Sequence, residues 1–400
     1  MLSVKQRDCT KNRKTEYKNT FLERPSWPLS LPFFFLIDFY IIFFQFSAAI
    51  FQIMLTFPLF RLPLVSLAVV VKHFHLNHLI NISFCSQKSR RLVKALRKKH
   101  SKICIQFLFS RKHCLYLNDR FPKDILPGED LDKIQYTIIS IKRKSDSLDT
   151  RHLKVGDSLV PVSSRANKHG EIDLHFHFDD VFDGSKTMSI YICSFLENPI
   201  YGLNLSSDFQ PDQIRRTIDW AVSFQKSVES YYIEDDKISD DHFRNVLDVC
   251  SSANKFAFYG KLSPEFRHQF TFENDSITLT NAFWVNLDNL LKINCRKCTV
   301  WGSNLTNLEV NQYLKHWKTG KFPKLKVAYF EMEDINLEVL LADLSAVEFP
   351  EGEERTFKDA SNRDVTINYG FDIQMENGTL ATIVHQGGNI VSKWFYMVVW

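Results

Sequence analysis

The chain has 400 residues, of which 44% are hydrophobic and 24% charged, and this composition excludes a wholly disordered polypeptide. The formal net charge of +4 is unevenly spread, because residues 54–118 hold twelve Lys and Arg and no Asp or Glu. Residues 119–400 hold 31 basic and 42 acidic residues, a net charge of −11. The sequence therefore predicts a basic N-terminal part followed by an acidic body.

The eight cysteines are scattered along the chain. A disulfide framework usually has denser cysteines in a shorter secreted chain, so this spacing favours a reduced protein of the cytoplasm or nucleus. Cys295 and Cys298 form a Cys-x-x-Cys pair, but a structural zinc site needs a second pair of ligands. The sequence also contains no phosphate loop, nucleophile elbow or His-Glu-x-x-His motif. We therefore expect no metal, no cofactor and no enzymatic activity.

Residues 1–53 are unlike the rest of the chain. The first 28 are polar and basic, and residues 31–53 are rich in Phe and Ile. The apolar stretch has a suitable length for a membrane span, although one Asp and two Gln interrupt it. A Ser-Ala-Ala sequence at residues 47–49 also resembles a signal-peptidase site.

Both membrane interpretations meet a topological conflict, because they would place residues 54–100 in the lumen, away from the cytosol. Seven basic residues precede the apolar stretch, so the N-terminus is expected to stay in the cytosol and the following residues to cross the membrane. A third interpretation is that residues 1–53 are translated noncoding sequence, since AT-rich DNA encodes runs of Phe, Ile and Tyr. We favour this interpretation, with translation beginning at Met54.

Residues 54–100 have the pattern of three short helices. Leu62-Pro63 is expected to open the first helix. The backbone N–H groups of a helix's first turn have no partner within the helix, so proline, which lacks an N–H, is tolerated there. Asn77 and Ser86 are suited to cap the second and third helices. So small a unit buries little surface, so it requires the rest of the chain or a partner. The basic residues of the third helix are expected to face outward: Arg90, Arg91, Lys94, Arg97 and Lys98.

Residues 101–210 are predicted to form a β-rich segment with an antiparallel layer. Four runs mix β-branched and aromatic residues with alternating polarity: residues 103–109, 136–141, 171–178 and 188–195. Pairs of Asn, Asp, Pro and Gly between these runs supply turns.

From Pro211 the pattern changes to helices alternating with strands. Helices are expected to begin at Pro211 and to occupy residues 240–250, 284–291, 305–317 and 336–342. Strands are expected at residues 230–233, 255–259, 276–279, 297–301 and 324–330. The strands recur at steps of roughly 19 to 27 residues, close to the period of a leucine-rich repeat. Residues 211–345 are therefore predicted to form an irregular, leucine-rich-repeat-like βα array.

Residues 346–400 are predicted to be a C-terminal β segment. Asn377-Gly378 lies between two alternating runs and predicts a β hairpin, and residues 395–400 form a final strand candidate. The expected fold class is α+β, with a helical N-terminal module, the β-rich segment, the βα array and this hairpin.

Two parts of the sequence resemble a known family. Phe57-Pro-Leu-x-Arg-Leu-Pro63 and residues 79–93 resemble an F-box of the type expanded in nematodes. Residues 281–291, 303–307 and 314–325 resemble the F-box-associated domain that accompanies it, and the two parts occur in the family's order.

The resemblance implies a substrate-recognition subunit of an SCF-type (cullin–RING) ubiquitin ligase. It implies that the F-box binds the Skp adaptor and that the F-box-associated domain binds a target protein, which the sequence does not identify. The residues that the match assigns to Skp binding are Leu59, Leu62, Pro63, Val69, Leu79, Ile82 and Leu92.

Four side chains of the βα array are candidates for target binding, because aromatic residues are frequent at interface hot spots. Trp284 and Trp317 have helical spacing and are expected to be buried. Trp301 ends a strand and is expected to be exposed. Trp301 and His316 are therefore the candidate target-binding residues.

Two other functions remain open. One is a membrane-anchored interaction protein that uses residues 31–53. The other is a nucleic-acid binder that uses the basic residues 88–112, although few aromatic residues accompany them as a stacking surface requires. We interpret the basic residues as a solvated helix face and expect no nucleic-acid partner.

Overall fold

The computed structural model describes residues 59–97, 103–110, 113–118, 137–144, 151–166, 172–206, 212–350, 352–358, 364–384 and 393–400. Residues 56–400 form one compact unit. The interpretations of residues 1–53 lie outside the described residues. Within the described ranges, no helix is both long enough and apolar enough to cross a bilayer.

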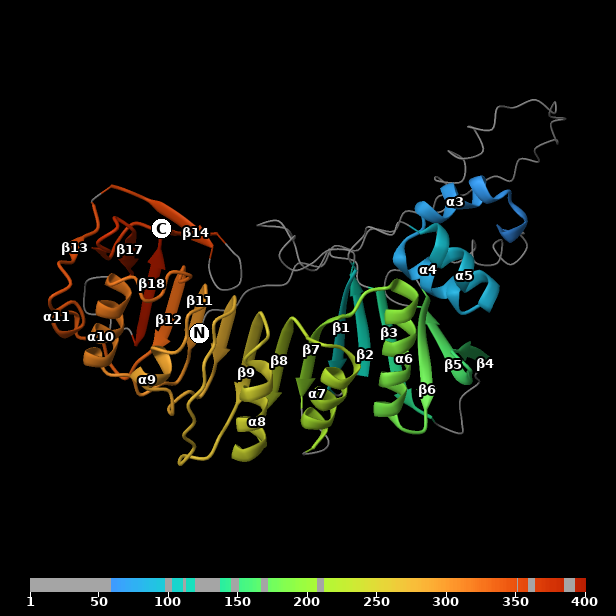
Figure 1. Ribbon diagram of the computed structural model, residues 1–400, viewed down its shortest axis with the longest axis horizontal. Coiled ribbons are helices and arrows are strands. Elements are labelled where there is room, and N and C mark those ends of the chain that lie inside the picture. Colours follow the sequence, from blue (N-terminus) through green and yellow to red (C-terminus); the bar gives the residue numbers. More distant parts are fainter. Residues whose placement is uncertain are drawn as a thin grey trace, which may run out of the picture. The chain divides into compact units, whose positions relative to one another are not determined.

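The first described part of the chain, residues 59–97, is a module of three helices (Figure 1). A 3₁₀ turn, η1 (Leu59–Arg61), precedes α3 (Leu64–Lys72), α4 (Leu76–Ser83) and α5 (Gln87–Leu96). Pro63 directly precedes α3, as predicted, and the Ser86 side chain accepts the N–H of Ser89 at the start of α5. We call residues 59–97 the helical module.

The predicted cap at Asn77 is wrong. The second helix begins at Leu76, after an extended His75, so Asn77 lies in its first turn. There the Asn77 side chain accepts a hydrogen bond from Asn81. Phe74, in the turn before this helix, is buried.

The body of the described chain is built on one sheet of sixteen strands (Figure 1). Its order is β13-β16-β17-β18-β12-β11-β10-β9-β8-β7-β1-β2-β3-β6-β5-β4. The described residues mix helices and sheet, which supports the predicted α+β class at this coarser level. The sheet continues without a break across the predicted domain limits at residues 210 and 345, because β7 pairs with both β1 and β8, and β12 pairs with β18.

The β-rich segment forms one end of this sheet. Its strands are β1 (Cys104–Phe109), β2 (His113–Asn118), β3 (Thr137–Arg143), β4 (Arg151–Val155), β5 (Ser158–Ala166) and β6 (Ile172–Phe178). Neighbouring strands here are antiparallel except for β3 and β6, which are parallel. Three of the four predicted strands, those beginning near residues 103, 136 and 171, are confirmed.

The fourth predicted strand, residues 188–195, is wrong, because these residues belong to the helix α6 (Val181–Leu196). The Asp180 side chain caps this helix by accepting the N–H of Asp183. The buried Met188, Ile192 and Phe195 recur every three or four residues and cover β2, β3 and β6. The β-branched and aromatic composition suggested a strand, but packing on the sheet decides in favour of a helix.

The predicted alternation of strands and helices after residue 211 is observed, and the array begins one strand earlier than predicted, at β7. It contains β7 (Ile200–Ser206), α7 (Gln213–Phe224), β8 (Ser230–Asp235), α8 (Asp240–Cys250), β9 (Lys255–Gly260), β10 (Ser276–Leu279), α9 (Leu287–Leu290), β11 (Lys297–Val300), α10 (Asn307–Lys318), β12 (Val327–Glu331) and α11 (Leu337–Leu340). The strands β7 to β12 are parallel to their neighbours in chain order.

The helices α6 to α10 lie on one face of the sheet (Figure 1). Aromatic contacts join the two layers: Trp220 of α7 lies 5.8 Å from Phe107, and Phe243 of α8 lies 4.1 Å from Phe258, between ring centroids. Tyr313 of α10 contacts Phe330 of β12 at 5.4 Å. The main apolar core of the body therefore lies between the helices and this face.

The C-terminal strands close the sheet. These are β13 (Val347–Glu348), β16 (Phe371–Gln374), β17 (Leu380–Ile383) and β18 (Trp394–Val399), and a separate pair consists of β14 (Arg355–Lys358) and β15 (Asp364–Ile367). The predicted hairpin is confirmed, because Gly378 adopts a positive φ of 87° between β16 and β17. The final strand β18 runs antiparallel to β12.

Candidate functional site: a helical module and an aromatic sheet face

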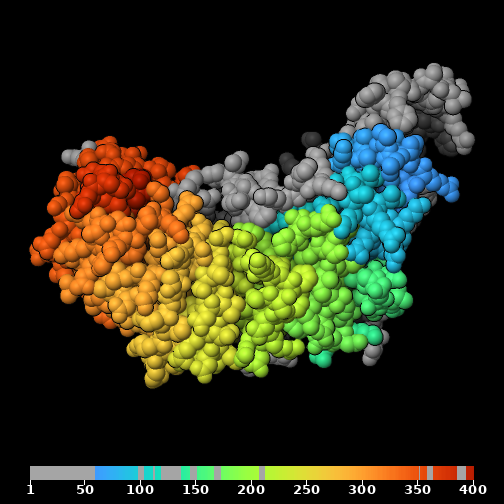
Figure 2. Space-filling view, viewed as in Figure 1, coloured from blue at the N-terminus to red at the C-terminus, as the bar shows by residue number. Residues whose placement is uncertain are grey.

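The helical module presents apolar side chains on α3. Leu64 is 62% exposed and Val65 is 78% exposed, whereas Leu67 and Val71 on the other side of the helix are buried. Figure 2 shows the module, in blue, at the surface of the molecule. Exposed apolar side chains on a small helical unit are typical of an interaction surface.

The residues that the resemblance assigns to Skp binding differ in how far they are buried. Leu79 and Ile82 are buried in the core of the module and are not accessible to a partner. Pro63 is exposed. The remaining four, which are half-buried, are Leu59, Leu62, Val69 and Leu92. Four of these five accessible residues lie around η1 and α3, and Leu92 lies on α5.

The module is joined to the body through α6. The ring of Tyr191 stacks on Phe84, with 4.9 Å between ring centroids, and its hydroxyl donates to the Ser83 carbonyl at 2.9 Å. Phe84 also contacts Phe176 of β6 at 5.0 Å. Burial raises the pKa of Tyr191. These contacts hold α4 against the sheet body.

Basic residues of α5 strengthen the same contact, so the prediction that they all face outward is wrong. Arg97 is only 5% exposed, and it donates to the Leu196 carbonyl. Lys94 donates to the Ser194 carbonyl at 2.8 Å and pairs with Glu197 at 3.1 Å. Cations at the carboxyl end of a helix are favourable because carbonyls there are unpaired. The end of α6 therefore determines where these side chains lie.

Replacing Tyr191 by alanine is expected to release the module from the body before the sheet unfolds. The change removes the stack on Phe84 and the hydrogen bonds to Ser83. We expect amide hydrogens of α4 and α5 to exchange at least about tenfold faster, whereas those of β8 to β12 remain unchanged. Hydrogen exchange read by mass spectrometry measures this.

Tyr191→Phe is the matched control, since it keeps the ring and removes only the hydroxyl. We expect it to accelerate exchange by less than the alanine variant, in line with about 1 kcal/mol for one hydrogen bond. If Tyr191→Ala accelerated amide hydrogen exchange equally in the module and in the sheet, a local role for this contact would be contradicted.

The face of the sheet opposite the helices carries a row of aromatic side chains. Buried and less buried residues alternate along the strands, as in β9, where Phe256 and Phe258 are buried and Tyr259 is half-buried. The neighbouring rings on this face follow one another across the strands. We call them the aromatic row: Tyr232 of β8, Tyr259 of β9, Trp301 after β11, Tyr329 of β12 and Trp394 of β18.

Successive rings of the aromatic row are in contact. The centroid distances are 4.8 Å for Tyr232 to Tyr259, 6.3 Å for Tyr259 to Trp301, 6.5 Å for Trp301 to Tyr329 and 5.1 Å for Tyr329 to Trp394. Trp301 is 37% exposed and Trp394 is 39% exposed. The row therefore presents partly accessible π faces across the sheet.

Two carboxylates accompany the row, one near each end. Glu234 is opposite Tyr259 in the pairing of β8 and β9, and Glu331 is opposite Trp394 in the pairing of β12 and β18. Burial raises the pKa of Tyr232, and the charge of Glu234 raises it further. Burial and then Glu331 raise the pKa of Tyr329.

The middle of this face comes from β10, β11 and β12. Residues 265–330 contain β10, α9, β11, α10 and most of β12. They match the F-box associated family. The comparisons with curated proteins and with solved structures gave no match. The F-box-associated segment thus contributes Trp301 and Tyr329 to the aromatic row, together with the α10 helix behind them.

Within the F-box-associated segment, the predicted burial of Trp284 and Trp317 is confirmed, at 2% and 0% exposure. Trp301 is exposed, as expected. His316 is half-buried on α10, which covers the other face of the sheet through Tyr313. The structure therefore does not bring the two candidate target-binding residues together.

The sequence reasoning missed most of the aromatic row. Each of Tyr232, Tyr259 and Tyr329 lies near the end of a predicted strand and alternates with buried apolar neighbours, which places it on the opposite face of the sheet. This pattern is the signal that could have identified them. Their partnership depends on strand order, which alternation within one strand does not reveal.

Cys295 and Cys298 are both buried in the F-box-associated segment. A hydrogen bond from Cys295, together with burial, raises the pKa of Cys298 well above its ordinary value. A buried thiol with a raised pKa is unreactive and packs as a small apolar side chain. Among the described residues, no group of three or more His, Cys, Asp or Glu side chains is placed to hold a metal ion.

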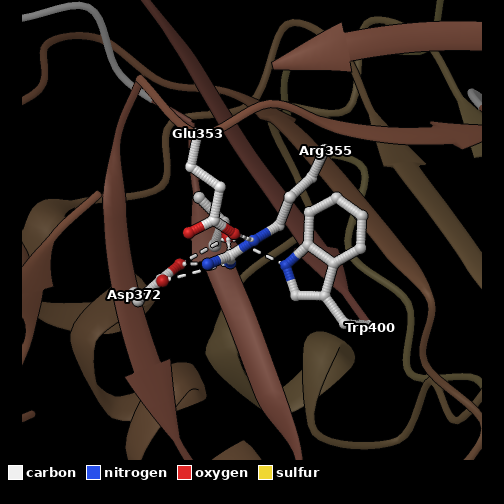
Figure 3. Close-up of polar contacts among 5 residues, drawn as sticks. Glu353, Arg355, Asp372 and Trp400 are labelled. Atoms are coloured by element: carbon white, nitrogen blue, oxygen red, sulfur yellow. Dashed lines mark hydrogen bonds and ion pairs between the residues drawn. The ribbon is translucent and has the colours of Figure 1, made fainter. Parts of the chain in front are cut away.

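A polar network lies beside the C-terminal strands (Figure 3). Arg355 of β14 donates from Nε to Glu353 at 2.5 Å and from a terminal nitrogen to Asp372 of β16 at 3.1 Å. The buried Thr382 hydroxyl donates to Asp372 at 2.6 Å and accepts from the indole of Trp400 at 2.8 Å. The network joins the separate β14–β15 pair to the main sheet.

Proposed function

We propose that this chain is the substrate-recognition subunit of an SCF-type (cullin–RING) ubiquitin ligase of the cytoplasm or nucleus. The match of residues 265–330 to the F-box associated family carries the proposal. The helical module precedes that segment and exposes Leu64 and Val65, which supports a docking role. In this proposal the module binds the Skp adaptor and the sheet body binds a target protein.

The proposed subunit performs no chemical step. It raises the effective concentration of the target's lysines near the ubiquitin-conjugating enzyme, and such tethering depends on the geometry between the two binding surfaces. The contacts of Tyr191 and Lys94 with neighbouring elements support a defined orientation of the module on the body. An orientation of this kind favours the transfer of ubiquitin to those lysines of the target that lie within a limited zone.

Docking is tested by capture of a purified Skp adaptor on the full chain. We expect the wild-type chain to retain the adaptor and Val65→Asp to reduce retention at least about tenfold, because a charge in an apolar contact is costly. The Leu62→Ala/Pro63→Ala double variant is expected to act in the same direction. Binding is measured by surface plasmon resonance.

Leu159→Asp is the matched control, since Leu159 of β5 is 70% exposed and lies outside the helical module. It is expected to bind the adaptor as the wild type does. Absence of adaptor binding by the folded wild-type chain, or equal loss in the control, would overturn the proposed function.

A further inference from the structure

The aromatic row has the chemistry of a cation-binding surface. A Lys or Arg side chain is attracted to the face of Tyr or Trp within about 6 Å, and Trp is the best such partner. Five rings follow one another across the sheet at centroid distances between 4.8 and 6.5 Å. Glu234 and Glu331 add a negative charge at two positions along this row.

Neither glutamate is neutralised by a basic side chain within the described residues. Glu331 accepts the backbone N–H of Gly302 at 2.7 Å, a bond that leaves its negative charge in place. Glu234 is exposed. Glu331 is half-buried. Both carboxylates beside the aromatic rings therefore keep a negative charge that no basic side chain of the described residues neutralises.

Two lysines of the same face lie away from the row. Lys255 and Lys297 are at the amino ends of β9 and β11, four residues before Tyr259 and Trp301, which is about 13 Å along a strand. Three lysines do lie near the carboxyl edge: Lys237, Lys261 and Lys393. Five carboxylates there outnumber them: Glu234, Asp236, Glu331, Glu333 and Asp334.

We propose that the aromatic row, with Glu234 and Glu331, binds an extended segment of a partner protein through its Lys or Arg side chains. The inference rests on the target-binding half of the proposed function and names the chemistry of the target. The rings follow one another across the sheet at centroid distances between 4.8 and 6.5 Å, so a segment lying across the strands meets several rings in succession. The net charge of −11 on residues 119–400 draws such a segment toward this surface.

The test uses a library of random twelve-residue peptides displayed on phage and selected on the full chain. The peptides recovered are expected to be enriched in Lys and Arg at least about twofold over the unselected library. Chemically synthesised copies of the recovered peptides are then titrated by fluorescence anisotropy. Their affinity is expected to fall as salt concentration rises, because the contacts are partly ionic.

Glu234→Gln/Glu331→Gln is the decisive variant, since glutamine keeps an acceptor for the Gly302 N–H and removes only the charge. We expect it to weaken binding of the recovered peptides about tenfold, and Trp301→Ala to weaken it by a similar factor. Glu265→Gln/Glu273→Gln is the matched control, because it changes the net charge equally at exposed residues outside the row. It is expected to bind as the wild type does.

Three outcomes would overturn the inference. The recovered peptides could be neutral or acidic, both double variants could weaken binding equally, or the wild type could enrich Lys and Arg no more than the Trp301→Ala chain does. These outcomes leave adaptor capture unaffected, so the proposed function survives them. Loss of adaptor capture with basic peptides still selected would instead overturn the proposed function alone. Circular dichroism of each variant confirms that a loss of binding reflects the surface and not the fold.

Discussion

Replacing Trp317 by alanine is expected to lower the free energy of unfolding by about 4 kcal/mol, in the range found for buried large aromatic residues. Trp317 lies in the last turn of α10 and is completely buried, among the largest side chains in the core. Its removal leaves a cavity between α10 and the sheet that the surrounding backbone cannot fill. Urea unfolding followed by circular dichroism measures the loss.

Trp317→Phe separates the volume of the ring from its polar atom. The Trp317 Nε1 atom is buried with no hydrogen-bond partner in the described part of the chain. Phenylalanine removes that unpaired donor while leaving a smaller void, so we expect a loss of only about 1 kcal/mol. If the two variants were equally unstable, the core around α10 would not be packed as the structure has it.

Replacing Arg355 by methionine is expected to cost about 3 kcal/mol of unfolding free energy. The side chain of Arg355 is 17% exposed and that of Asp372 is 12% exposed, so the change leaves a largely buried carboxylate without its cation. The Thr382 hydroxyl still donates to Asp372, but it does not replace the charge. The loss is measured by urea unfolding, as for Trp317.

Two further variants test this explanation. Combining Arg355→Met with Asp372→Asn is expected to cost less than the sum of the single changes, because the second change removes the charge that the first left unpaired. Arg215→Met breaks an exposed pair with Asp219 within α7 and is expected to cost less than about 1 kcal/mol. Equal costs for Arg355→Met and Arg215→Met would contradict a buried role for Arg355.

Local patterns explain which elements were predictable. The strands β8 to β11 and the helix α8 follow from alternation and helical spacing within short windows, and the α8 bounds agree with the prediction. The Ser86 cap and the Asn377-Gly378 turn are equally local, since each depends on side-chain chemistry within a few residues. The resemblance to the F-box-associated domain was confirmed for residues 265–330 because it too rests on short runs of sequence.

The errors concern elements whose form depends on distant partners. Residues 188–195 have strand-forming composition, yet they lie in α6 because their apolar side chains pack on β2, β3 and β6. Arg97 has the sequence context of a solvated helix face, yet the end of α6 buries it. In both examples the deciding contact joins residues that are far apart in the chain.

The sequence by itself determined the alternation of strands and helices, the order of the helical module and the F-box-associated segment, and the burial of Trp317. Each of these depends on residue type and spacing within a short window. Only the tertiary structure decided that one sheet continues through the predicted β-rich segment, βα array and C-terminal segment. It also decided that Tyr232, Tyr259, Trp301, Tyr329 and Trp394 form one row. Strand order brings these rings together, and strand order is set by packing between residues that no local window contains.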